Sequence, residues 1–185
     1  MVEQTENIVE SDSAGGAHMG ARLAAGIAAG LIGGILMLGF MMIYAGVNDA
    51  GATMPLKALG AFEYGVVSFV SGPSAMIVGA LIQLGFSIVL GILFALFVSR
   101  RTSIVAALFA GIVVGIAIWV AMDLFVLPFA DPTMAARMEL MPQAYFIAHL
   151  LYGLGLATSA IFVRAFAKDR HRRAGAQHAA ETQPI

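Results

Sequence analysis

The chain has 185 residues, of which 60% are hydrophobic and only 11% are charged, and its mean hydropathy is +0.90. Soluble domains are about 45–50% apolar and about 25% charged, so this excess of apolar residues needs lipid around it. The formal net charge of −1 gives no bulk attraction to nucleic acid, and the absence of cysteine excludes disulfides and thiolate metal sites.

The chain starts with a polar stretch whose composition differs from that of the apolar residues after it. Residues 1–21 are mildly acidic, and the segment SDSAGGAH has the small polar residues typical of disorder. The stretch lacks the basic start and short apolar region of a cleavable signal peptide, so we expect the first apolar run to be retained. The expected organisation is a disordered tail over 1–21, a membrane domain over 22–167, and a basic and then polar tail over 168–185.

Four apolar windows are long enough to cross a lipid bilayer. They cover residues 23–45, 73–98, 104–127 and 145–163. About 20 mainly apolar residues span the ~30 Å of hydrocarbon, and backbone groups in lipid must bond within a helix. The predicted fold class is therefore all-α, an integral membrane four-helix bundle made of two hairpins.

The two connections on the far side of this bundle are not ordinary solvated loops. Residues 46–72 are too apolar for such a loop and too interrupted to span, so we expect a re-entrant or interfacial segment within 53–70. The sequence SGPS at 71–74 predicts a serine cap and a proline in the first helical turn. A short amphipathic helix is predicted to start at Asp131 and Pro132 and to stop at Pro142.

Lysine and arginine indicate how the chain is threaded. Eight of the ten basic residues fall on one side of the four-span path, and only Lys57 and Arg137 fall on the other. Because basic loops stay in the cytoplasm, we expect both termini there. The basic run near the C-terminus consists of Arg164, Lys168, Arg170, Arg172 and Arg173. It could bind anionic lipid head groups, although we favour a simple topology anchor.

Small residues recur at every fourth position along the spans. The repeating glycines are Gly26, Gly30 and Gly34 in the first window, Gly111 and Gly115 in the third, and Gly153 in the fourth. This spacing lets helix backbones approach closely. It could serve a dimer face, but all four windows carry such a pattern, so we favour packing within one chain.

Several polar residues are expected at membrane depth. His149 is 15 residues from Arg164, which places it about 22 Å from the cytoplasmic edge, and Gln83 lies at a similar level. The candidate polar cluster consists of His149, Asp123, Gln83, Tyr152, Tyr145 and Glu63. Ionisable groups inside a membrane are functional candidates by default. The alternative, which we weigh equally, is that His149 donates a hydrogen bond across a helix interface and only holds helices together.

Other chemistries have weaker support. His149 is the only histidine within a window, whereas a b-type haem usually takes two axial ligands. Zinc would need more ligands than His149, Asp123 and Glu63 provide. Three methionines share one stripe of the short external helix: Met134, Met138 and Met141. Thioethers can hold Cu(I), but such a stripe more often packs on a core or on lipid, so we expect no metal and no cofactor.

The fourth window contains AHLLYG, and the third ends in DLFVLPF. In these segments, and in its layout over about residues 22–166, the chain resembles small four-span bacterial inner-membrane proteins of the YagU-like type. The resemblance implies a location in the inner membrane. It assigns no role to any single residue.

The sequence thus predicts a multi-pass membrane protein without enzymatic activity. It would act as a packing or accessory subunit or form a small homo-oligomer, with the lipid bilayer and either its own copies or a larger membrane complex as partners. The alternative is a small transporter or proton-linked channel that uses the polar cluster around His149 and Asp123. An enzyme or metal carrier built on the external methionines and carboxylates ranks third.

Overall fold

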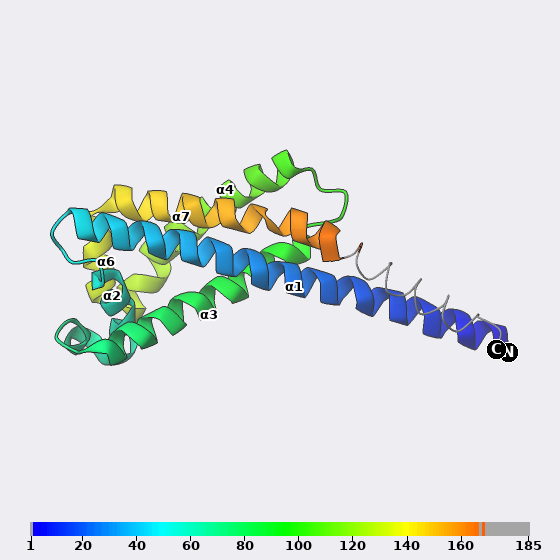
Figure 1. The fold of residues 1–185 in the computed structure, drawn as a ribbon, viewed down its shortest axis with the longest axis horizontal. Coiled ribbons are helices and arrows are strands. Elements are labelled where there is room, and N and C mark those ends of the chain that lie inside the picture. The colour runs from blue at the N-terminus through cyan, green and yellow to red at the C-terminus, as the bar shows by residue number, and fades with distance from the viewer. Residues whose placement is uncertain (1, 167, 169–185) are drawn as a thin grey trace, which may run out of the picture.

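The computed structural model describes residues 2–166 and 168, and all regular structure in that part of the chain is helical (Figure 1). The elements are α1 (Val2–Val47), α2 (Met54–Tyr64), the 3₁₀ turn η1 (Gly65–Phe69), α3 (Pro73–Phe97), α4 (Ile104–Ala121), the π-helical turn η2 (Met122–Val126), α5 (Leu127–Ala130), α6 (Pro132–Leu140) and α7 (Pro142–Ala157). The all-helical fold class is therefore confirmed.

Four stretches are long and apolar enough to cross a membrane: Met19–Val47, Pro73–Phe97, Ile104–Ala130 and Pro142–Phe166. They match the four expected windows in number and order, and each differs from its window by a few residues at the ends. At the N-terminal end the structure differs from the expected disordered tail, because α1 already begins at Val2. No proline interrupts residues 2–21, so the ladder of backbone hydrogen bonds can continue through them.

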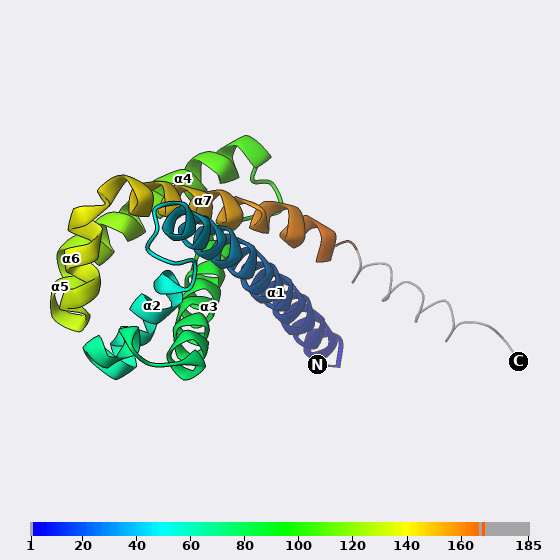
Figure 2. The same ribbon diagram turned by 60° about the vertical axis from the view of Figure 1, so that its left-hand side comes forward.

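The four long helices form an open arc rather than a closed bundle. Helix α1 packs against α3 on one side and α7 on the other, and α7 packs in turn against α4 (Figures 1 and 2). Helices α3 and α4 make no extended contact with each other. The two predicted hairpins are thus present, and they are joined through the α1–α7 interface.

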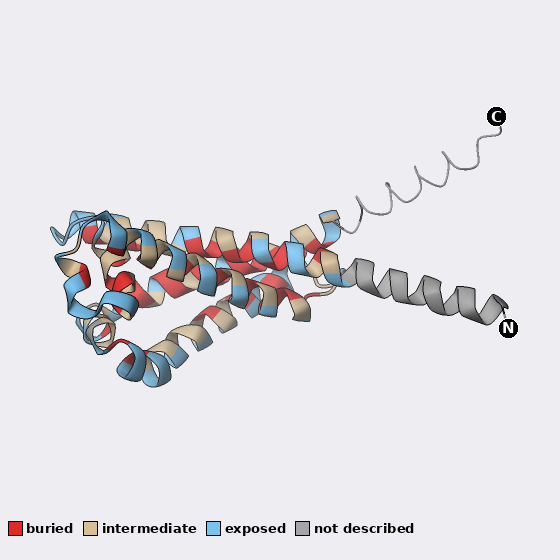
Figure 3. Cartoon of the chain, turned by 90° about the horizontal axis from the view of Figure 1, so that it is seen from below, coloured by how far each residue is buried: buried red, intermediate tan, exposed pale blue. Residues whose placement is uncertain are grey.

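Helices α1 and α7 are the two central helices of this arc, and α7 is the more deeply buried. In its most apolar stretch, 56% of the residues are buried, compared with 17% for the stretch that contains α4. Figure 3 shows that buried residues follow the inner faces of the helices, while exposed residues lie on the outside. The outward residues include large apolar side chains such as Leu81, Phe109 and Ile161.

The repeating glycines lie where helix backbones meet. All six face a neighbouring helix of the same chain: Gly26, Gly30 and Gly34 lie against α3, Gly111 and Gly115 against α7, and Gly153 against α4. A Cβ added at Gly26 would lie 2.5 Å from the Cα of Ile92. The spacing therefore serves packing within one chain, which was the favoured alternative.

A second glycine contact was not anticipated from the sequence. Gly33 of α1 meets Gly155 of α7 so closely that a side chain on either would collide with the other helix. Adjacent Gly33 and Gly34 thus serve two different interfaces, since consecutive helical residues point about 100° apart. This pair lets α1 pack tightly on both α3 and α7.

The segment between α1 and α3 folds into a compact helical cap. Helix α2 packs along the first turns of α3, where Gly60 and Gly79 allow close approach. Ser68 donates a hydrogen bond to the Lys57 carbonyl, and Lys57 Nζ donates to the Phe69 carbonyl at 3.2 Å, so η1 is tied back onto α2. Helix α2 also touches α6, so the segments before α3 and before α7 meet at the same end of the arc (Figure 1).

Two helix starts in these segments test the capping predictions. The serine cap predicted for α3 is wrong: Gly72 occupies the cap without a side-chain hydrogen bond, and Ser71 Oγ instead donates to the Val67 carbonyl at 2.8 Å. The start of α6 is confirmed, because Asp131 Oδ1 accepts from the Met134 N–H at 3.0 Å. A serine near a helix start can satisfy the preceding turn instead, which sequence spacing does not distinguish.

The end of the third span is irregular for a reason that lies in its sequence. Pro128 has no N–H to give to the Leu124 carbonyl, and its ring crowds that carbonyl. The chain adopts a π-helical turn directly before this proline, over Met122–Val126. Asp123 belongs to this turn.

The other end of the arc carries basic residues. Arg22 Nη1 donates to the Leu96 carbonyl at 3.4 Å, and Arg164 donates to the Thr102 carbonyl. These bonds join α1 to the end of α3, and the helical stretch that follows α7 to the α3–α4 connection. Lys57 and Arg137 lie at the opposite end, where the Arg137 guanidinium is 4.5 Å from the centre of the Phe69 ring. Lys168 is exposed, whereas the predicted head-group residues Arg170, Arg172 and Arg173 lie outside the described residues.

Candidate functional site

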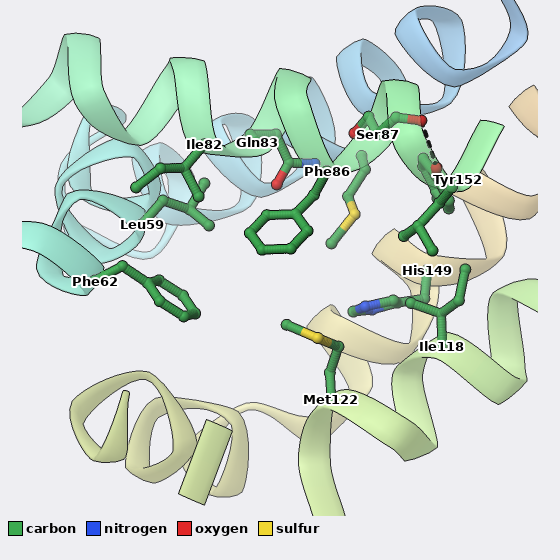
Figure 4. A pocket seen from close by; sticks show the side chains of 12 residues that line it. Leu59, Phe62, Ile82, Gln83, Phe86, Ser87, Ile118, Met122, His149 and Tyr152 are labelled. Atoms are coloured by element: carbon green, nitrogen blue, oxygen red, sulfur yellow. Dashed lines mark hydrogen bonds between the residues drawn. The ribbon is translucent and has the colours of Figure 1, made fainter. Parts of the chain in front are cut away.

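A cavity of about 80 Å³ lies in the space between α3 and α4 (Figure 4). Its apolar walls are Met37 of α1, Leu59 and Phe62 of α2, Ile82, Phe86 and Leu90 of α3, and Ile118 and Met122 from the third span. Its polar lining consists of Gln83, Ser87, His149 and Tyr152. An apolar pocket between helices with a few converging polar groups is the usual form of a small-molecule site.

His149 projects from α7 toward this cavity, and only 4% of its surface is exposed (Figure 4). Its Nδ1 lies 2.7 Å from the carbonyl oxygen of Tyr145, one turn earlier in the same helix. Since a carbonyl oxygen only accepts hydrogen bonds, Nδ1 carries the proton and donates. The neutral ring then has a lone pair at Nε2, which is a hydrogen-bond acceptor.

This bond answers one of the questions that the sequence left open. The Nδ1–H of His149 donates to a carbonyl of its own helix, so this group does not join two helices. Gly115 of α4 packs directly on the His149 backbone and keeps that part of α7 close to α4. The position of the ring is therefore fixed by its own helix and by the neighbouring backbone.

Gln83 lies on the opposite wall of the cavity. It is 9% exposed, and its amide extends from α3 toward the space that His149 also faces (Figure 4). No side-chain hydrogen bond joins Gln83 to another described residue. Two buried polar groups from different helices thus face one apolar space.

Tyr152 has a structural role at the edge of the cavity. Its hydroxyl donates to the Ser87 carbonyl at 3.0 Å, which links α7 to α3 (Figure 4). Its ring also lies against Gly33 of α1. Tyr152 therefore holds three helices together, and it provides a bond across an interface of the kind that one of the two alternatives assigned to His149.

The other members of the predicted polar cluster lie elsewhere. Glu63 is exposed on α2, Asp123 is partly exposed in the π-helical turn, and neither lines the cavity. Within the described part of the chain, Asp123 forms no ion pair with His149. Tyr145 is buried, but its hydroxyl turns toward α6 and donates to Met134 Sδ at 3.6 Å. Counting residues along the helices predicted which residues lie at a similar height, but it did not predict the direction in which each side chain points around its helix.

The described residues contain no group of three or more His, Cys, Asp or Glu side chains that could hold a metal ion. The methionine stripe of α6 packs inward, with Met138 buried and Met134 and Met141 against the same core. Sequence reasoning missed the apolar walls of the cavity, such as Phe86 and Met122. No signal could have found them, because apolar residues in apolar helices look alike whichever way they face.

Comparisons with protein-family models, with curated proteins and with solved structures find no match for this chain. Its resemblance to the YagU-like inner-membrane proteins therefore stays a prediction. The case for a function rests on the geometry of the helices and of the cavity between them.

Proposed function

We propose that this chain is a multi-pass protein of the inner (plasma) membrane with both termini in the cytoplasm. The observation that carries the proposal is the set of four long apolar helices. Large apolar side chains cover their outward faces, which would be an exposed hydrophobic patch in water but matches lipid. The gathering of basic side chains at one end supports the orientation.

Within the membrane, the chain acts without a catalytic centre as an accessory subunit or small homo-oligomer. Helix α4 supports this role, because within the chain it packs mainly on α7 and not on α3. Helices in lipid associate through tight packing and polar contacts, so a bare helix can accept a partner helix. The bound partner would cover the outer face of α4, which includes Val105, Phe109 and Val113.

A small transporter or proton-linked channel is the second candidate, and the cavity with His149 and Gln83 favours it. The expected acidic partner, Asp123, does not face that cavity. Toward the basic end, helix backbones meet directly at Gly111 and Gly153. The geometry of the cavity therefore supports the binding of a ligand better than the passage of a solute or proton across the membrane.

Reporter fusions test the membrane topology. Alkaline phosphatase, which is active only outside the cytoplasm, is fused after Ile185 in one version and inserted at exposed Gly51 in another. We expect activity from the Gly51 insertion and none from the fusion after Ile185. The reverse pattern would overturn the orientation, and a soluble cytosolic product would overturn membrane insertion.

The accessory role is tested by purification in a gentle detergent, followed by measurement of the protein mass in the complex. We expect a stoichiometric partner or a defined oligomer that is lost when Phe109 on the outer face of α4 is replaced by a bulky polar residue. A matched change at Ile161 on the outer face of the fourth span should leave the complex intact. A strict monomer in native lipid would count against this role.

A further inference from the structure

We propose that the cavity between α3 and α4 binds a neutral, membrane-soluble amphiphile through a hydroxyl group held between His149 and Gln83. The inference rests on the proposed membrane location and adds the class of ligand. Both side chains are more than nine-tenths buried and face the same space from opposite walls (Figure 4).

The hydrogen-bonding capacity of the two side chains selects a hydroxyl. His149 Nδ1 already donates to Tyr145, which leaves Nε2 as an acceptor. The Gln83 amide can donate through its NH₂ group. A hydroxyl does both things at once: its proton bonds to Nε2, and its oxygen accepts from the amide.

Other chemical classes fit this site less well. A carboxylate has no proton to give to Nε2, and an alkane would leave both polar groups unsatisfied in an apolar environment. A cation would need a compensating carboxylate, but Asp123 and Glu63 do not line the cavity. The ligand is therefore uncharged.

The rest of the cavity fits an apolar body. Phe62, Phe86, Ile118 and Met122 supply walls from α2, α3 and the third span. The cavity of about 80 Å³ has room for only part of a long molecule. Because α3 and α4 do not pack together, the remaining tail can lie between them and reach the surrounding lipid.

Helix α2 closes one side of the cavity, whereas the side between α3 and α4 is not closed by helix packing. Helix α2 lies along α3, contacts α6 and supplies Leu59 and Phe62 to the cavity wall, so the cavity is lined on that side. The ligand would therefore enter sideways from the bilayer.

Photolabelling of the purified full-length protein in lipid nanodiscs tests the proposal. The probe is a long-chain fatty alcohol with a diazirine close to the hydroxyl, and the control probe is its methyl ether. We expect the alcohol to label cavity residues such as Phe86, Ile118 or Met122, in competition with unlabelled alcohol. The ether, which has no proton for Nε2, should label them roughly tenfold less.

Variants then identify the groups that recognise the hydroxyl. His149→Leu should lower labelling by the alcohol about three- to tenfold while leaving labelling by the ether unchanged. Gln83→Leu should lower labelling by both probes, because the ether oxygen also accepts from the Gln83 amide. Asp123→Asn is the matched control and should have no effect. If a leucine variant fails to fold, the comparison of alcohol with ether on the unchanged protein still decides.

Two results would overturn the proposal. Equal labelling by alcohol and ether would show that the hydroxyl is not recognised and that the polar groups bind water only. Labelling outside the cavity would place the amphiphile elsewhere. Neither result affects the reporter fusions, so failure of this inference is distinguishable from failure of the membrane assignment.

Discussion

The close contact between α1 and α3 at Gly26 gives a prediction whose magnitude can be worked out from the structure. A Cβ at this position would lie 2.5 Å from Ile92 Cα and 2.8 Å from the Gly91 carbonyl oxygen, both of which are backbone atoms. Ordinary contacts of a Cβ atom begin at 3.4 Å, so Gly26→Ala would push the two helices apart by about 1 Å. A gap of that size forfeits about a quarter to a half of each atom-pair attraction along the interface.

The expected loss of stability combines two opposing terms. Overpacking of this kind costs about 1–3 kcal/mol, whereas alanine is favoured over glycine within a helix by about 1 kcal/mol. Gly26→Ala should therefore lower the free energy of unfolding by up to about 2 kcal/mol. Gly85→Ala in α3 is the matched control, because its added Cβ meets nothing within 4 Å. That variant should be unchanged or slightly more stable.

Reversible unfolding by SDS in mixed micelles provides the measurement, with fluorescence of Trp119, the chain's single tryptophan, as the signal. The two alanine variants are compared with the unchanged protein under the same conditions. If Gly26→Ala were as stable as Gly85→Ala, α1 and α3 would not meet at Gly26, and the arc of helices would be incorrect.

Two further outcomes are expected in the same unfolding assay. Tyr152→Phe removes the hydroxyl that donates to Ser87 and should cost about 0.5–1.5 kcal/mol, whereas Tyr145→Phe, which loses only a bond to sulfur, should cost less. Equal losses would mean that the Tyr152 bond does not join α7 to α3. Asp131→Ala should cost about 1 kcal/mol because it removes the cap of α6, while Asp131→Asn keeps an acceptor for the Met134 N–H and should be close to neutral. A neutral Asp131→Ala would show that the cap contributes nothing.

The sequence by itself determined the helices. Uninterrupted apolar runs of sufficient length can satisfy their backbone groups only as helices, so the four long elements could be predicted along with most of their ends. Proline and aspartate marked the start of α6 for equally local reasons. The spacing of Gly26, Gly30 and Gly34 also indicated a contact surface, because helical periodicity places them on one face.

Only the tertiary structure decided which surfaces meet. Helical rise gave the level of His149, Gln83 and Asp123, but contact also depends on rotation about each axis and on the neighbour that each face meets. Ile118 and Met122 line the cavity one helical turn apart, and Asp123, the next residue, points about 100° away from them and stays outside it. The separation of α3 from α4, which creates the cavity, results from the way α1 and α7 pack between them, and no local pattern in either helix encodes it.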